Sequence, residues 1–278
     1  MHAASAIQKL ARKGKHFSDR LPARPFREER WPAWQRQFPG QPRMVLARAG
    51  LACLDRAGEH WECWLSGQEQ GQLAGYALEK RRREWLGGRL AAKWAVDRFW
   101  GGGERDWRNI GIVAGADGRP GVLASDCPPP PFLSISHSGK CAAALAADLP
   151  CGLDVQRVSN RILVVRERFV LAGEVDILRG GLLPTMGDEQ ALTLLWAGKE
   201  AVRKMAWPPP LPFLTAIRLV AAAGGSTGGE VICSFAVAST EKGGATGPIL
   251  VLALLENEMA WAFGCRPEQE KRTEPWSL

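Results

Sequence analysis

Apolar residues follow two different periods along the chain, and each period predicts a different kind of element. Between residues 77 and 100 they recur at steps of three and four, the spacing of a helix with one buried face. Similar spacing predicts helices over 161–171 and 188–207. Alternating or continuous apolar runs, typical of strands, occupy residues 44–54, 61–65, 110–114, 132–136, 141–147, 213–222, 231–238, 249–255 and 259–264.

Breaks between these elements fall at glycine and proline. Gly101-Gly102-Gly103 ends the first predicted helix, and four prolines within 208–212 end the last one. Residues 115–121 predict a turn, and a looser segment is expected near Gly180-Gly181. The ordered body is expected to begin near Arg43, because no steady period precedes it.

Helices and short strands are distributed similarly in the two halves, so we predict an α+β fold of two similar α/β subdomains related by a pseudo-twofold. Each subdomain would hold a small, mostly antiparallel sheet and a long helix. No residue-level repeat is evident that would prove the relation. The predicted divisions are a basic, Pro- and Trp-rich extension over 1–40, an N-terminal lobe over 41–157, a C-terminal lobe over 158–266 and a tail over 267–278.

Composition narrows the class of protein. The 278 residues are 46% apolar and carry a net charge of +7, which favours an anionic partner. No apolar run approaches the roughly 18 residues of a membrane span, so no membrane partner is expected. Seven cysteines without a CxxC pair and four histidines without HExxH spacing predict reduced thiols in a cytoplasmic protein and no zinc site.

The central stretch of the chain gathers groups that suit a phosphate ester. A strand beginning at Phe132 runs into Ser136-His137-Ser138-Gly139-Lys140, which places hydroxyls, an imidazole and an ammonium at one strand end. The following Gly152-Leu-Asp-Val-Gln156 holds Asp154 and Gln156 two residues apart. In an extended segment such residues point to the same face, so their oxygens can meet one hard cation.

A second group lies within the predicted helix 188–207. Glu200 and Lys204 are four residues apart, hence one turn apart on one face. One reading is an ordinary surface ion pair worth roughly 0.3 kcal/mol. The other is a carboxylate that holds a cation or takes a proton, beside an ammonium that stabilises a leaving group. Magnesium prefers a few carboxylates together with substrate phosphate and water, and neither GxxxxGK[ST] nor GxGxxG is present.

The first long helix begins with a basic run, residues 80–83, and carries Arg89 two turns later. Charge runs of this kind are usually a solvated face. Arg82 and Arg89, seven residues apart, fall near one helical stripe that offers an alternative role as an anion cradle.

These motifs together resemble the Sfp-type 4'-phosphopantetheinyl transferases. The resemblance covers about residues 77 to 207, in matching order and spacing, and each motif alone is weak. The residues after Pro212 carry no motif. The matching pieces are Gly88-Arg-Leu-Ala-Ala-Lys93 behind the basic run, Gly118-Arg-Pro120, Ser134-Ile-Ser-His-Ser138, Gly152-Leu-Asp-Val-Gln156 and Trp196-Ala-Gly-Lys-Glu-Ala-Val-Arg-Lys204.

The resemblance implies an enzyme that transfers the 4'-phosphopantetheine arm of coenzyme A to a serine of an acyl or peptidyl carrier protein. The reaction would need Mg²⁺ and release adenosine 3',5'-bisphosphate. Glu200 would help to deprotonate the carrier serine, and Lys204 would stabilise the departing phosphate. The implied coenzyme A ligands are Arg83, Arg89, Arg119, Ser136 and His137, and the implied metal ligands are Asp154, Gln156 and Glu200.

One position departs from the family pattern: Gln156 stands where an acid is usual. An amide oxygen can still ligate a cation but adds no charge. The resemblance further implies an acidic carrier protein as partner, and we expect a monomer, because a two-lobed chain needs no second copy to complete its cleft. The alternatives are a non-catalytic relative that binds a carrier protein, and a nucleic-acid-binding module that uses residues 80–83 and the N-terminal tail.

Overall fold

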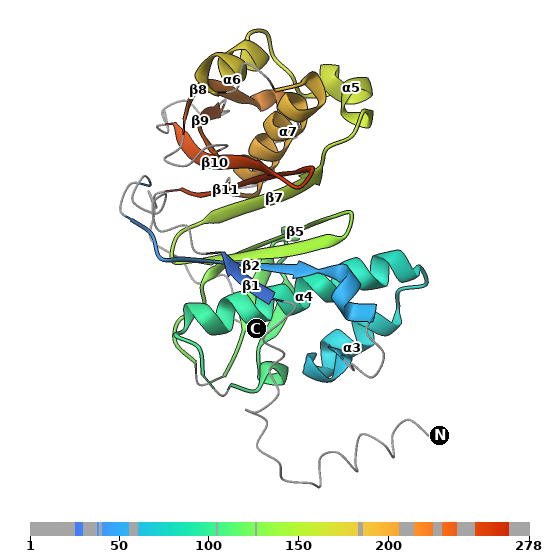
Figure 1. Cartoon of the computed structure of the whole chain (residues 1–278). Helices are drawn as coiled ribbons and strands as arrows, with labels where there is room; N and C mark the ends of the chain where they lie inside the picture. Colours follow the sequence, from blue (N-terminus) through green and yellow to red (C-terminus); the bar gives the residue numbers. More distant parts are fainter. Residues whose placement is uncertain are drawn as a thin grey trace, which may run out of the picture.

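The structure is a computed structural model (Figure 1). The predicted C-terminal tail, most of the predicted N-terminal extension and the proline run after residue 207 lie outside the residues that it describes. The described residues are 26–29, 38, 41–55, 61–103, 105–125, 127–182, 186–205, 214–224, 230–237 and 248–266.

Two antiparallel sheets lie against each other, and one long helix covers the outer face of each (Figure 1). The first sheet has the order β1-β2-β6-β5 and lies against α4, with bounds β1 (Phe26–Glu29), β2 (Met44–Gly50), β6 (Cys141–Ala147), β5 (Phe132–Ser138) and α4 (Glu79–Phe99). The second has the order β7-β11-β10-β9-β8 and lies against α7, with bounds β7 (Cys151–Arg157), β11 (Met259–Cys265), β10 (Ile249–Glu256), β9 (Glu230–Val237), β8 (Ile217–Gly224) and α7 (Asp188–Met205).

The smaller elements sit around these layers. A separate two-stranded sheet, β3-β4, follows α4. The remaining helices and strands are α3 (Gly67–Ala74), β3 (Gly111–Ala114), β4 (Pro120–Leu123), α5 (Arg161–Val165), α6 (Glu174–Leu182) and the 3₁₀ turns η2 (Leu51–Asp55), η3 (Trp61–Trp64), η4 (Trp107–Asn109), η5 (Arg166–Arg168) and η6 (Leu214–Ala216).

Strand β6 shows how the layers explain the apolar pattern. Its alanines alternate between two cores: Ala144 and Ala146 pack toward α4, whereas Ala143 and Ala147 pack between the two sheets. A strand covered on both faces reads as a continuous apolar run rather than an alternating one. The third core, between the sheets, also takes side chains from β7, β10 and β11 and so joins the two halves of the chain.

The order of elements repeats along the chain. A strand leads to helices, then to the long helix, then to four strands, once from β2 to β6 and again from β7 to β11. The pairing β2-β6-β5 corresponds to β7-β11-β10, but β3 and β4 form their own sheet, whereas β8 and β9 continue the second one. The predicted α+β class with antiparallel sheets is confirmed.

Several element boundaries differ from the prediction. The predicted strand 61–65 is the 3₁₀ turn η3, because a short apolar run does not distinguish helix from strand. The strand predicted over 44–54 ends at Gly50, and the strand predicted over 213–222 begins at Ile217. Strand β1 precedes Arg43 and pairs with β2, and helix α3 was not predicted.

One further segment was predicted to be irregular and is not: the glycines near residue 180 lie inside α6. The turn predicted at 115–121 is confirmed between β3 and β4, although it ends two residues earlier because β4 begins at Pro120. The predicted helix 161–171 is a short α-helix followed by a 3₁₀ turn. The glycine stop after α4 is confirmed: Gly101, Gly102 and Gly103 all have positive φ, a conformation that other residues rarely adopt.

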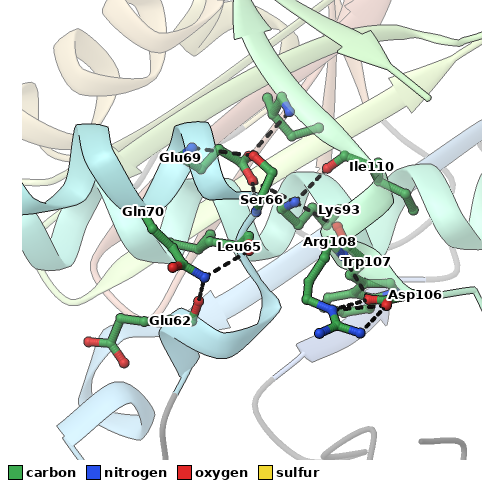
Figure 2. Close-up of polar contacts among 11 residues, drawn as sticks. Glu62, Leu65, Ser66, Glu69, Gln70, Lys93, Asp106, Trp107, Arg108 and Ile110 are labelled. Atoms are coloured by element: carbon green, nitrogen blue, oxygen red, sulfur yellow. Dashed lines mark hydrogen bonds and ion pairs between the residues drawn. The ribbon is translucent and has the colours of Figure 1, made fainter. Parts of the chain in front are cut away.

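A buried ion pair braces the first half (Figure 2). The Lys93 ammonium on α4 lies 2.7 Å from Glu69 Oε2 and also donates to the Trp107 carbonyl at 2.8 Å. The other carboxylate oxygen of Glu69 accepts the Ile112 amide of β3 at 3.2 Å, and Oε2 accepts the Ser66 amide. Helix α3, helix α4 and strand β3 therefore meet on one pair of charges, which is fully paired as buried charges must be.

The second half contains the same device. Lys199 on α7 donates to Glu174 Oε2 at 2.8 Å, and Glu174 Oε1 accepts the Leu219 amide of β8 at 2.8 Å. As with Ser66 and Glu69, the carboxylate accepts an amide three residues before it, that of Leu171. The two lysines lie in matching sequences, Ala91-Ala-Lys-Trp-Ala-Val96 and Ala197-Gly-Lys-Glu-Ala-Val202. The two halves therefore share a residue-level repeat around their buried lysines, which the sequence interpretation missed.

Candidate functional site

The two halves meet along a seam between β5 and β7, which lie side by side (Figure 1). Ser134, Ser136 and Ser138 of β5 accept hydrogen bonds from the amides of Leu153, Val155 and Arg157 at 2.9, 3.1 and 3.0 Å. Both sets of numbers rise together, so the two strands run in the same direction. In this ladder the serine hydroxyls accept the amide hydrogen bonds that backbone carbonyls accept in an ordinary sheet. The three serines are every second residue of β5, so their side chains lie on one face of the strand.

Asp154 lies in the middle of this seam. Its Oδ1 accepts the Ser136 hydroxyl at 2.9 Å and the Lys204 ammonium at 2.9 Å, and the residue is only 7% exposed. Its Oδ2 is buried and has no hydrogen-bond partner among the described residues. A buried carboxylate oxygen without a partner is costly, so this atom is the open position of the cluster.

Lys204 reaches the seam from α7. Its ammonium donates to the Leu153 carbonyl at 2.8 Å and lies 3.4 Å from the Ile135 carbonyl, in addition to Asp154. The helix comes close enough because β7 has a glycine beneath it: a Cβ on Gly152 would lie 1.9 Å from the Ala201 carbonyl oxygen. Lys204 is therefore held in place by both strands of the seam.

Glu200 precedes Lys204 by one turn of α7. Its carboxylate pairs with Arg203, whose guanidinium nitrogen is 2.9 Å away, and its side chain is 13% exposed. Gln156 is half-buried and lies on β7 two residues after Asp154, hence on the same face. The helix-facing side of β7 and the end of α7 therefore bring together Asp154, Lys204 and, one turn away, Glu200.

His137 lies on β5, on the opposite face of the strand from Ser136. Its side chain is 37% exposed, and its Nδ1 is 3.8 Å from Glu84 Oε2 of α4. Burial lowers the pKa of His137 below the usual histidine value, and the nearby Glu84 carboxylate offsets part of that shift. The imidazole is thus mainly neutral at pH 7 and able to donate one hydrogen bond.

Arg119 lies on the β3–β4 turn, near the start of β7. Its Nε is 3.4 Å from Asp117, and burial lowers the pKa of its guanidinium, with Asp117 and the Cys151 thiol acting in the opposite direction. The positive φ of Gly118 shapes this turn. Arg119 and His137 therefore mark the two ends of the stretch of β7 that carries Asp154.

The basic residues 80–83 at the start of α4 each lie close to a carboxylate. Lys80 and Arg81 lie 3.8 and 3.5 Å from Glu84, and Arg82 lies 2.8 Å from Glu62. Arg83 is half-buried and lies 3.8 Å from Glu79.

The stripe of Arg82 and Arg89 that had suggested an anion cradle faces other parts of the first half. Arg89 lies over the Trp85 ring at 4.8 Å, and its pKa is lowered by burial and raised in turn by Glu69. None of these contacts involves Asp154, Ser136 or Lys204. Arg89 therefore belongs to a different neighbourhood from the seam.

The donor set suits magnesium better than a metal held by protein alone. Among the described residues no three His, Cys, Asp or Glu side chains are grouped as a metal site. Magnesium is commonly bound by one or two carboxylates plus substrate phosphates and water. The free Oδ2 of Asp154 offers one such carboxylate oxygen, and Glu200, one turn before Lys204 on α7, carries a second carboxylate.

The serine ladder was the main feature missed in the sequence. Ser134, Ser136 and Ser138 alternate in a predicted strand, and that period places all three on one face. The sequence interpretation used Ser136 as a phosphate donor, but its single proton is directed at Asp154. Alternating serines on an edge strand were the signal that a second strand lies beside it.

Comparison with known proteins adds no relative: no protein family and no curated protein matches the chain. Among the described helices, none is both long and apolar enough to cross a membrane.

Proposed function

We propose that this chain is an enzyme that transfers the 4'-phosphopantetheine arm of coenzyme A to a serine of a carrier protein, with a phosphopantetheinyl-transferase-like fold. The observation that carries the proposal is the contact of Asp154 with Lys204, which unites two motifs of the resemblance that lie 50 residues apart. The Ser136 hydroxyl adds a third motif to the same contact at 2.9 Å.

Magnesium would be held by Asp154 and Glu200. Oδ2 of Asp154 is the atom with an open position, and Gln156 is near enough in the strand to contribute its amide oxygen directly or through water. When bound, the ion would neutralise charge on the pyrophosphate of coenzyme A. Ser136 orients Asp154 in this proposal, since its proton is already donated to Oδ1.

The chain's own residues would then move two protons. The carrier serine oxygen forms a bond to the β-phosphorus, and the bond from that phosphorus to the bridging oxygen breaks. Glu200 takes the serine proton, and Lys204 gives a proton or hydrogen bond to the leaving adenosine 3',5'-bisphosphate. Lys204 has one weak contact, 3.4 Å to the Ile135 carbonyl, that it can exchange for a phosphate oxygen.

His137 and Arg119 flank Asp154 along β7 and would hold the phosphates of coenzyme A. Arg83 is assigned to the adenosine bisphosphate part, and Arg89 retains a lesser binding role because its contacts lie elsewhere. The carrier protein would be acidic, in keeping with the net charge of +7. The nucleic-acid alternative is weakened, since each residue of the basic run 80–83 already lies within 4 Å of a carboxylate.

Incubation of candidate apo carrier proteins with the chain, coenzyme A and magnesium tests the proposal. A mass gain of one phosphopantetheine on the carrier, abolished by a chelator, is the expected result. Binding of coenzyme A without any transfer would favour the non-catalytic relative. Absence of coenzyme A binding, together with salt-dependent binding of DNA or RNA, would overturn the proposal in favour of the nucleic-acid module.

A further inference from the structure

Two cysteines lie opposite each other on neighbouring strands, one where the second half of the chain begins and one where it ends. Cys151 is the first residue of β7 and Cys265 is the last of β11, and the antiparallel register pairs them directly. The next pair outward is Pro150 with Arg266, and the Arg266 amide donates to the Pro150 carbonyl at 2.8 Å. Hydrogen-bonded and non-hydrogen-bonded pairs alternate in such a ladder, so Cys151 and Cys265 form a non-hydrogen-bonded pair.

This kind of pair has the spacing that a disulfide needs. Residues at non-hydrogen-bonded positions have Cα atoms about 4.5 Å apart and their side chains on one face. Disulfides span Cα separations of about 4.4 to 6.8 Å. Both cysteines belong to the core between the two sheets, 5% and 3% exposed, where Cys265 Sγ lies 2.9 Å from Met44 Sδ.

We propose that Cys151 and Cys265 are a redox-active pair that forms a cross-strand disulfide under oxidising conditions. The oxidant is a low-molecular-weight disulfide such as oxidised glutathione. One cysteine thiolate attacks it, giving a mixed disulfide and one released thiol, and the second cysteine displaces the other thiol. Two protein thiols thereby lose two electrons and two protons, and one external disulfide is reduced to two thiols.

Burial decides how fast this reaction runs. It raises the pKa of both thiols, so little thiolate exists in the closed protein. The Arg119 guanidinium acts against this rise of the pKa at Cys151, whereas burial remains the larger influence. Oxidation therefore proceeds through opening of the ends of β7 and β11 or during folding, and the finished bond is shielded from reductant.

The bond would tie together the two ends of the second half. The whole segment from β7 to β11, including α7, lies between the two cysteines. A cross-link that closes so long a loop restricts the unfolded chain strongly. The bond would also anchor the start of β7, the strand that forms the seam, because Cys151 lies three residues before Asp154.

The test uses the full chain with Cys141→Ser, which leaves Cys151 as the only cysteine in the tryptic peptide 141–157. The protein is refolded in oxidised or reduced glutathione, denatured, alkylated and digested. We expect peptide 141–157 linked to peptide 243–271, two hydrogens lighter than the sum, and a melting temperature about 5–10 °C above that of the reduced protein.

Cys265→Ser should lose both the linked peptide and the difference in melting temperature. Cys233→Ser is the matched control: Cys233 is also buried, with a pKa raised to about 12, but faces Val251 and Ala222 rather than a cysteine. It should retain both signals. Full alkylation of Cys151 and Cys265 after oxidative refolding, or a link from either to another cysteine, overturns the proposal. Neither readout depends on transferase activity.

Discussion

The strand beneath each long helix differs in chemistry between the two halves. In the first half, the residues of β2 that face α4 are Val45, Ala47 and Ala49, which pack in an apolar core. In the second, the corresponding side of β7 carries Asp154 and Gln156 beside Gly152. The helix-facing side of this strand is therefore apolar in the first half, whereas in the second half it carries a carboxylate.

The helices show the same contrast within their matching sequences. The buried lysine is common to both, but it is followed by Trp94 in α4 and by Glu200 in α7. One turn further, Arg98 lies over the Trp94 ring at 5.2 Å, whereas Lys204 reaches Asp154 at 2.9 Å. The repeat preserves the bracing pair and varies the residues one and five positions after its lysine, so the scaffold and the chemistry are carried by separate positions.

The largest expected effect comes from breaking this asymmetry at Glu200. Under the proposed function, Glu200→Gln keeps the size of the side chain but removes its charge and its capacity to take a proton. Transfer should fall by roughly 10²- to 10⁴-fold, while the free energy of unfolding changes by at most about 1 kcal/mol because the pair with Arg203 is partly exposed. Single-turnover transfer to a carrier protein and urea unfolding measure the two quantities.

Trp94→Phe at the matching position of α4 is the control for Glu200→Gln. It alters the same place in the repeat, and the Trp94 ring lies beneath the Arg98 guanidinium of the same helix. Transfer should stay within about twofold of the unmodified protein, well short of an acid–base loss. Near-normal turnover in Glu200→Gln would reject the assignment of the base.

The bracing pairs should show the opposite behaviour, a loss of stability in both halves. Lys199→Met leaves Glu174 buried without its cation, and Lys93→Met does the same to Glu69. Each should lower the free energy of unfolding by about 3–5 kcal/mol. Urea denaturation measures the free energy of unfolding. Lys199→Met combined with Glu174→Gln should recover part of the loss, because the second change removes the unpaired buried charge. If either variant lost less than about 1 kcal/mol of free energy of unfolding, which is the contribution of a surface ion pair, the two pairs would not be equivalent braces.

The sequence predicted which side chains lie together within each motif, but it did not predict which motifs contact one another. Strand alternation placed Asp154 and Gln156 on one face, and helical spacing placed Glu200 and Lys204 one turn apart. The seam of β5 and β7 was not predictable from those periods, because it depends on how two sheets pack. The buried Glu69 does have a local signal in the sequence, because Ser66 followed three residues later by Glu69 is the pattern of the capping box that the two residues form.

Buried lysines were the other difficulty. Lys93 and Lys199 look like surface residues by type, since lysine is almost never fully buried unless paired. Their partners lie far away in sequence, so no local pattern identifies them. Only the comparison of the two halves in three dimensions connects the two Ala-x-Lys-x-Ala-Val segments to one structural purpose.

A smaller effect is expected at Gln156, the position that departs from the resemblance. Gln156→Glu adds a carboxylate to the face of β7 that already holds Asp154. If magnesium binds there, the midpoint of magnesium activation should fall by about tenfold, the size of effect typical of groups around a metal. Gln156→Ala, which removes the amide oxygen without adding charge, should not lower the midpoint. An unchanged midpoint in Gln156→Glu would place this side chain outside the metal shell.

The smallest effect concerns the pH dependence of coenzyme A binding at His137. Burial holds the pKa of the free imidazole below the usual value of about 6.5, and a phosphate beside it would raise that pKa again. Binding then takes up a proton, so affinity rises as pH falls from about 6.5 toward the lowered pKa, by at most about tenfold per pH unit. Stability runs the other way: the unfolded chain binds more protons in this window, so acid destabilises the fold.

Calorimetric titration with coenzyme A at several pH values in that window measures the proposed linkage at His137. His137→Gln retains a hydrogen-bond donor but cannot be charged, so its affinity should lack the additional rise at low pH. The titration of the ligand's own phosphate, with a pKa near about 6, affects both proteins equally and cancels in their difference. Parallel pH profiles for the two proteins would show that the imidazole does not meet a phosphate, which would confine ligand contacts at the seam to Arg119 and Lys204.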